Sequence, residues 1–330
     1  MIKSRTLMPF VAGLFAAFLS VSNLQAQPLV TIDTVAVGDP GNVADTTGYG
    51  AVADVFAIGK YEVTIGQYTS FLNAAAATDT YSLYNPSMGS NLNVEGISRV
   101  GSDGSYTYSV ISNSFGYSGN RPITYVSWFD GARFANWMNN GASTETGAYT
   151  LDGAMSGIIT VNPGATWSLP SEDQWYKAAY YKGGGTNAGY WDYPTQSDTA
   201  PGNIVGGATN QANYNNGVYS VTQSNTLDST LNYLTDAGSF SGSAGAYDTF
   251  DQGGNVSEWN DAVIDSSRGV RGSAWYYLED FLQSSSRGVN GPTNESSRVG
   301  FRVASVPEPS TYALLLMTAA GALWMTRRRR

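Results

Sequence analysis

The chain has 330 residues, enough for one large domain or two small ones, with a formal net charge of −9 and neither cysteine nor histidine. The missing side chains exclude a thiol nucleophile, a disulfide, and any zinc, copper or iron site built from thiolate or imidazole within this chain. The acidic charge argues against binding to nucleic acid, whereas oxygen-ligated Ca²⁺ and carboxylate-based hydrolysis stay open.

The N-terminus has the organisation of a secretory signal over residues 1–26. Lys3 and Arg5 supply a positive start, an apolar run follows over 10–21, and Ala26 is a small residue before the expected cleavage point. We therefore expect an exported protein.

Three segments further along share one pattern, a strand followed by the N-terminal cap of a helix. The cap pairs are Thr64 with Gln67, Ser127 with Asp130, and Ser171 with Gln174. Apolar residues follow each cap at helical spacing, so we expect three amphipathic helices, the second ending near 139–141.

The remaining segments predict strands and loops. Residues 27–55 are polar, with β-type runs at 29–32 and 51–56, and residues 105–110 alternate like a strand. Residues 182–250 are predicted to be loops.

The stretch 253–303 combines a glycine turn with short strands. It opens G-G-N-V-S-E-W at 253–259, continues R-G-V-R-G-S-A-W at 268–275 and closes R-V-G-F-R-V at 298–303. Two glycines allow the backbone carbonyls to turn toward one point, and Glu258 can add a hard oxygen ligand of the kind that Ca²⁺ prefers.

At these residues the chain resembles the formylglycine-generating enzyme (sulfatase-modifying factor) family. The family carries G-N-x-x-E-W, G-G-S and a terminal G-F-R in this order, and matching segments at 61–68, 121–137 and 169–179 extend the likeness over about 57–304. The resemblance implies one α+β domain over 27–305, with little regular secondary structure and a core like that of a C-type lectin.

The resemblance also implies a structural calcium ion held by loop oxygens. The corresponding residues are Asn213, Tyr214, Gly253, Gly254, Val256 and Glu258. Glu258 has two other interpretations, a carboxylate held by backbone N–H groups and a catalytic acid, and its place beside glycines favours a structural role.

The family's oxidase holds copper with two cysteines a few residues beyond G-G-S. Those positions fall near Tyr276 and Phe281 in this chain, so the resemblance implies no catalytic residue here and no copper. Trp275, Tyr276 and Tyr277 are then candidates for a ligand groove, because aromatic rings offer large rigid surfaces to sugars or peptides. Plain aromatic packing is the alternative.

The C-terminus, residues 306–330, consists of V-P-E-P-S, an apolar run over 312–325 and four arginines. It resembles the PEP-CTERM sorting signal of Gram-negative bacteria, which implies cleavage near Pro-Glu-Pro by an exosortase-type enzyme and transfer to the envelope or extracellular matrix. A plain C-terminal membrane anchor is the alternative.

Together these features predict an exported, envelope- or matrix-associated binding or structural module stabilised by calcium, with a protein or exopolysaccharide as partner. One alternative is a formylglycine-generating-type oxidoreductase with non-standard chemistry. The other is a lectin-like module that binds exopolysaccharide.

Overall fold

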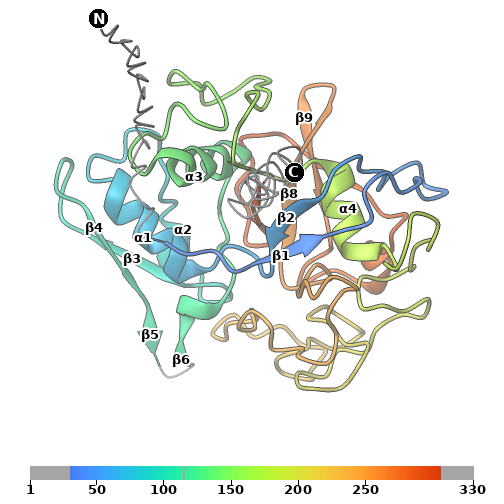
Figure 1. Ribbon diagram of the computed structural model, residues 1–330. Coiled ribbons are helices and arrows are strands. Elements are labelled where there is room, and N and C mark those ends of the chain that lie inside the picture. Colours follow the sequence, from blue (N-terminus) through green and yellow to red (C-terminus); the bar gives the residue numbers. More distant parts are fainter. Residues whose placement is uncertain (1–29, 114–115, 306–330) are drawn as a thin grey trace, which may run out of the picture.

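The computed structural model describes residues 30–113 and 116–305 (Figure 1). The predicted signal peptide, residues 1–26, and the predicted sorting tail with its apolar run, residues 306–330, lie outside the described residues. In the part that is described, no helix is long and apolar enough to cross a bilayer.

Three helices begin at the predicted caps. They are α1 (Ile65–Ala75), α3 (Trp128–Asn140) and α4 (Glu172–Tyr180); shorter turns of helix are α2 (Ser87–Ser90), η1 (Ser118–Asn120) and η2 (Glu279–Leu282). Each of the three caps forms both hydrogen bonds of a capping box, and α3 ends at Gly141 in the left-handed region with a φ of 69°. The three helix predictions are confirmed.

Two four-stranded sheets and two hairpins complete the regular structure. The first sheet has the order β1 (Thr34–Val37), β2 (Phe56–Gly59), β12 (Ala304–Ser305) and β7 (Trp167–Ser168). The second has the order β10 (Gly288–Asn290), β9 (Ser267–Arg271), β8 (Ser257–Ile264) and β11 (Val299–Phe301). The hairpins pair β3 (Ile97–Val100) with β4 (Thr107–Val110) and β5 (Ser112–Asn113) with β6 (Gly116–Tyr117). Only β8 and β11 pair in parallel within these ladders.

The strand predictions are confirmed at β4 and at β2, which lies in the strand expected before the Thr64 cap, but are wrong in two other places. The first strand lies at 34–37 instead of 29–32 or 51–56, because Val35 is the residue that pairs with Ile58 of β2. The segment before α3 forms a single bridge between Thr64 and Pro122 rather than a strand. Between 182 and 250 the chain has only isolated bridges, so the predicted loops are confirmed.

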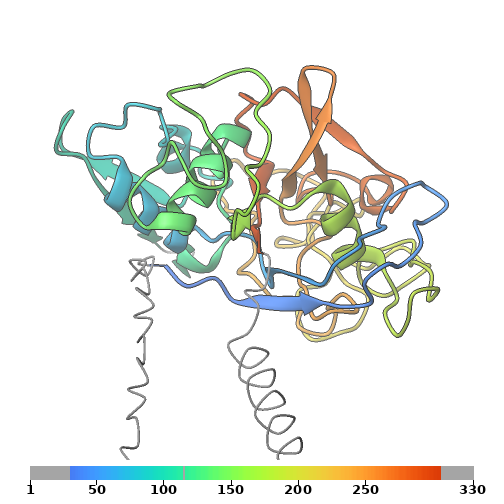
Figure 2. The same ribbon diagram turned by 45° about the horizontal axis from the view of Figure 1, so that its top comes forward.

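Aromatic side chains fill the core between α1, α3 and the second sheet. The ring centroids of Phe71 and Phe134 are 5.4 Å apart, as are those of Phe134 and Phe301, and all three rings are fully buried. Figure 1 shows α1, α3 and the β3–β4 hairpin on one side of the molecule and β1, β2, β8, β9 and α4 on the other. Figure 2 shows the same division after rotation, with the irregular chain of 182–250 beneath the second group.

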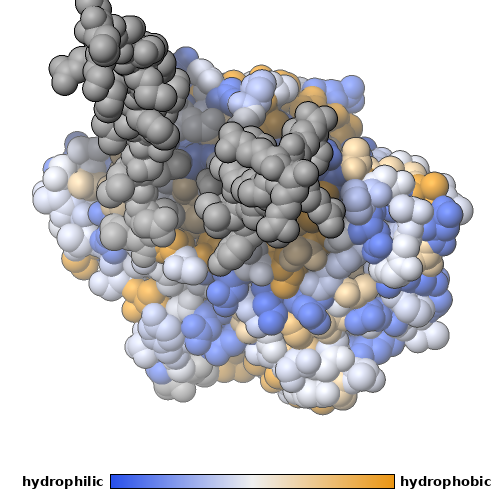
Figure 3. Space-filling view, viewed as in Figure 1, coloured by the Kyte–Doolittle hydropathy of each residue, from blue (hydrophilic) through white to orange (hydrophobic). Residues whose placement is uncertain are grey.

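The face seen in Figure 3 has hydrophobic side chains scattered among polar ones where grey atoms leave it uncovered. Scattered apolar residues are ordinary on a protein surface, so this face by itself indicates no binding site.

Candidate functional site

Glu258, on β8, is a fully buried carboxylate with three hydrogen bonds. Its oxygens accept from Nε and Nη2 of Arg302, both at 2.6 Å, and from the indole N–H of Trp175 at 2.7 Å. Arg302 also donates to the carbonyls of Gly59 and Phe250. The pair therefore links the segment between β11 and β12 to β2, α4 and β8, and each buried charge is compensated by the other.

The two segments of the implied calcium site do lie together. A parallel bridge joins Asn213 to Gly254, and a Cβ at Gly254 would lie 2.2 Å from the Asn213 carbonyl oxygen. Gly254 has a φ of 84°, so both its backbone conformation and this close approach require glycine. The glycine turn thus closes the loop segment onto the start of β8.

Polar groups of Asn213 and Tyr214 are engaged with protein partners. The side-chain amide of Asn213 donates to the Tyr233 carbonyl at 2.9 Å, and the main-chain carbonyl of Asn213 accepts from the Asn255 N–H at 2.8 Å. The Tyr214 carbonyl accepts from the Asn203 amide at 3.2 Å. Over the described ranges, no group of three or more carboxylates is arranged to hold a metal ion.

In this geometry the carboxylate of Glu258 does not fit a calcium ligand, because Arg302 and Trp175 already use its oxygens. Calcium binding by the neighbouring backbone of Gly253, Gly254 and Val256 stays a prediction.

Two further buried carboxylates lie near Arg302, and sequence reasoning missed them. Glu62 is 2% exposed and neither carboxylate oxygen has a hydrogen-bond partner within 30–113 and 116–305, while Asp251 accepts from the Gly238 N–H at 2.6 Å. Burial raises the pKa of Glu62 well above its usual value, and the charge of Asp251 raises it further. Burial also raises the pKa of Asp251 to about 6. One guanidinium cannot offset three carboxylates, so the protonated form of Glu62 is favoured.

A small cavity of about 180 Å³ opens beside β9 and β10. Its wall includes Ser273, the serine of the R-G-S segment, together with Tyr277, Phe281, Val289 and Asn290. Phe281 and Val289 are 51% and 46% exposed, which leaves an apolar rim at the mouth of the cavity. Exposed apolar groups that gather around a concavity are typical of binding sites.

Ser273 is the unusual residue of this cavity. It is 4% exposed, its hydroxyl has no hydrogen-bond partner among the described residues, and its φ is 66°. A buried hydroxyl without a partner and a non-glycine residue in the left-handed region both cost free energy. Such features cluster at functional sites.

Tyr276, Tyr277 and Phe281 form a row of rings that we call the aromatic face. Tyr277 lies 6.2 Å from Tyr276 and 5.1 Å from Phe281 between ring centroids. The Arg298 guanidinium lies over the first two rings, at 5.2 and 5.0 Å. Tyr276 is 40% exposed, so the face is open to solvent.

Trp275, which the sequence placed in the same groove, is instead buried, with 3% exposure. It stacks on Tyr233 at 5.0 Å between centroids, contacts Tyr219, and donates from its indole to the Ser297 carbonyl at 3.2 Å. Its ring is therefore a packing element beneath the aromatic face.

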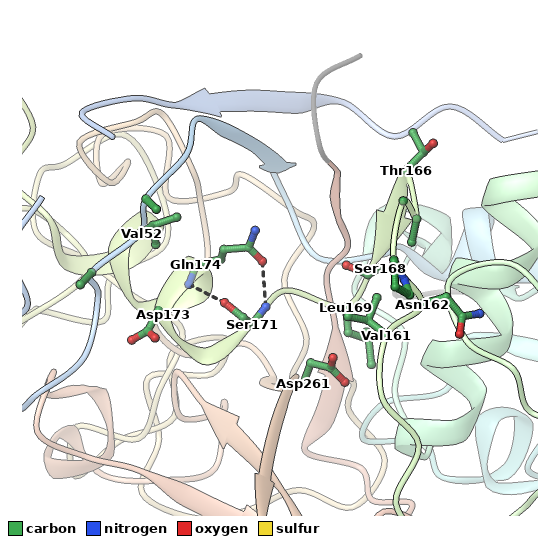
Figure 4. A pocket seen from close by; sticks show the side chains of 15 residues that line it. Val52, Val161, Asn162, Thr166, Ser168, Leu169, Ser171, Asp173, Gln174 and Asp261 are labelled. Carbon is green, nitrogen blue, oxygen red and sulfur yellow. Dashed lines mark hydrogen bonds between the residues drawn. The ribbon is translucent and has the colours of Figure 1, made fainter. Parts of the chain in front are cut away.

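A larger cavity, of about 770 Å³, lies elsewhere, between β7 and the start of α4 (Figure 4). Val52 and Asp173 lie on one side of it and Val161 on the other. Its carboxylates have partners: Asp173 accepts from a backbone N–H at 2.8 Å, and Asp261 pairs with Arg268 at 3.1 Å. Sequence reasoning missed this cavity because segments far apart in the chain form its walls.

Comparison with known proteins identifies two segments. Residues 34–306 match the family described as "Sulfatase-modifying factor enzyme 1-like domain". Residues 305–330 match the PEP-CTERM protein-sorting motif. No curated protein matches the chain.

Several solved structures are similar in fold. The structure titled "Crystal Structure of CarF" is 24% identical, covers 84% of this chain and 99% of its own, and has a TM-score of 0.53. "Treponema denticola variable protein 1" is 16% identical over 84% of this chain and 96% of its own, with a TM-score of 0.44. PvdO from Pseudomonas aeruginosa is 16% identical over 83% and 92%, with a TM-score of 0.43. From its match over 34–306, the chain belongs to the sulfatase-modifying factor enzyme 1-like family, as its motifs predicted.

Proposed function

We propose that this protein is an exported, non-catalytic binding module whose ligand is a neutral polysaccharide of the extracellular matrix. One observation carries the proposal. An open aromatic face adjoins a cavity with a buried hydroxyl that finds no hydrogen-bond partner in the described part of the chain, where the resemblance puts the catalytic groove of the family's oxidase.

The chemistry of this face favours sugars. Sugar rings present apolar C–H faces, which stack on Tyr277 and Phe281, and hydroxyl groups, which the free hydroxyl of Ser273 can pair with inside the cavity. A net charge of −9 would repel a polysaccharide rich in carboxylates, which is why we favour a neutral one.

The main alternative, oxidase activity, lacks support from the available side chains. The chain has no cysteine for copper, and aromatic residues stand near the implied cysteine positions, at Tyr276 and Phe281. Turnover of a cysteine-containing peptide together with stoichiometric copper or iron in the purified protein would support the oxidase instead.

The sorting motif supports the proposed location. A PEP-CTERM motif implies recognition by an exosortase-type enzyme, and it fits an exported protein anchored at the cell envelope. We further propose that the protein is released from that anchor into the matrix, so that its attachment to the membrane is transient.

The test is binding of the exported protein to an array of neutral and acidic polysaccharides. We expect binding to neutral polysaccharides that falls about fivefold in Phe281→Ala, since loss of one stacked ring removes about 1 kcal/mol. The matched control is Ile204→Ala, an exposed apolar residue outside the site with 56% exposure, which should leave binding unchanged. Equal binding by both variants, or no binding to any polysaccharide, would contradict the proposal.

A further inference from the structure

The last described strand, β12, is held on both sides. Ala304 pairs with Ile58 of β2 and Ser168 of β7, and Ser305 pairs with Ala57 and Trp167 of the same two strands. Ala304 is 1% exposed and Val303, whose carbonyl accepts from the Gly59 N–H at 2.8 Å, is fully buried. The domain therefore remains folded up to its final described residue.

The residues just before β12 are fixed as firmly. Phe301, in β11, packs in the aromatic core, and the Arg302 guanidinium is bonded to Glu258. Releasing the residues before β12 as well would break the buried ion pair between Arg302 and Glu258. The free energy of opening therefore rises steeply once more than β12 is released.

The sorting motif follows without a spacer. The family domain ends at residue 306 and the sorting motif begins at 305, so the two matches overlap. Pro307 is two residues beyond Ser305, and two residues span at most about 7 Å. A cleavage point near Pro-Glu-Pro thus lies next to a strand whose main chain is already paired with two neighbours.

An enzyme that cuts a peptide bond binds its substrate as an extended segment, largely through main-chain hydrogen bonds on both sides of that bond. Within 303–305 those main-chain groups belong to the ladders with β2 and β7. Binding by the enzyme and docking of β12 therefore compete for the same groups.

We propose that docking of β12 controls processing, so that the sorting enzyme cleaves the chain only while β12 is released from the sheet. Cleavage breaks one peptide bond, frees the amine of the tail, and passes the acyl carbon to water or to an acceptor amine. When opening is fast relative to cleavage, the rate follows the fraction of molecules in which β12 is open. The inference rests on the sorting motif and is independent of the ligand proposed above.

The experiment uses the full chain in cells. The precursor accumulates and folds while the exosortase-type enzyme is absent, the enzyme is then induced, and loss of precursor is followed by immunoblot. One variant carries six Ser/Gly residues between Ser305 and Val306. A matched control carries the same six residues after Gly104, in the exposed turn between β3 and β4.

We expect the spacer after Ser305 to speed cleavage of the folded precursor by at least about tenfold, since a modest opening cost already gives that ratio. The control insertion should leave the rate at the wild-type level. Arg302→Ala without a spacer should also speed cleavage, because it weakens the hold on the strand. Protease resistance of each precursor before induction shows that the domain is folded.

Cleavage of the folded wild-type precursor as fast as the spacer variant would overturn the proposal. The same holds if neither form is cleaved, because the spacer leaves the motif accessible.

Discussion

The buried pair of Glu258 and Arg302 and the aromatic face around Phe281 come from the same stretch of chain, yet they differ in almost every physical respect. The pair is fully buried with its charges compensated. The face exposes Tyr276 and Phe281 and adjoins the Ser273 hydroxyl, which has no hydrogen-bond partner among the residues described. The pair includes the Glu and Arg of the motifs by which the family is recognised, and the face consists of residues next to those motifs.

This difference separates stability from recognition. Motif residues such as Gly254 and Glu258 fix the backbone by close approach and by a buried ion pair. Tyr276 and Phe281 instead meet solvent, so we expect substitution there to cost the fold little. Family membership therefore says more about the scaffold than about the ligand.

The largest effect is expected for Arg302→Ala. It leaves Glu258 buried without its cation and should lower the free energy of unfolding by about 3–5 kcal/mol. Urea denaturation measures it. The control is Lys182→Ala at the partly exposed pair with Asp198, 3.7 Å apart, where the loss should stay below about 1 kcal/mol. If both variants lost a similar amount of unfolding free energy, the proposed difference between buried and solvent-accessible charge pairs would be wrong.

Trp275→Ala should come next and should separate two neighbouring rings. Trp275 is buried, so truncation should cost about 3–5 kcal/mol of stability. Phe281→Ala, at a ring that is 51% exposed, should change stability by only about 0.5 kcal/mol while weakening polysaccharide binding. A stable Trp275→Ala protein would mean that this ring is not part of the core.

Glu62 makes stability depend on pH. Because its pKa is raised in the folded protein, the folded state binds the proton more tightly than the unfolded chain does. Its contribution to stability is complete below the unfolded value near 4.5 and is lost as pH rises through the raised pKa. Glu62→Gln should therefore be more stable than the wild type at pH 8, by about 1–3 kcal/mol, and similar to it at pH 4. Melting temperatures measured from pH 4 to pH 8 test this. A constant difference between the wild type and Glu62→Gln over that range would contradict it.

A small gain in stability is expected at Ser273. Its φ of 66° favours glycine, so Ser273→Gly should raise stability by about 0.5–1 kcal/mol. If the hydroxyl pairs with the ligand, the same variant should bind polysaccharide more weakly. A variant that gains stability and keeps full affinity would show that the hydroxyl has no part in binding.

Local signals in the sequence were sufficient for the helices. Thr64 and Gln67 lie within one turn of each other, so the capping box depends on no distant residue. The first strand could not be placed in this way, because only pairing with 56–59 decides which apolar residues of the polar segment 27–55 form it.

In the candidate site too, features set by nearby residues could be predicted and features set by distant contacts could not. The resemblance pointed to Tyr276 and Phe281, which follow the R-G-S segment within eight residues and both lie against the ring of Tyr277. Burial of Trp275 could not be predicted, because Tyr219 and Tyr233, which cover it, come from a loop without periodicity. The partner of Glu258 was equally hidden, since Arg302 is far along the chain.

The most direct test of the separation between scaffold and ligand face is a crystal structure of the exported protein with a bound neutral oligosaccharide. We predict a sugar ring stacked on Tyr277 or Phe281, with one hydroxyl in the cavity at hydrogen-bond distance from Ser273. A sugar bound in the larger cavity between Val52 and Val161, with the aromatic face empty, would contradict it.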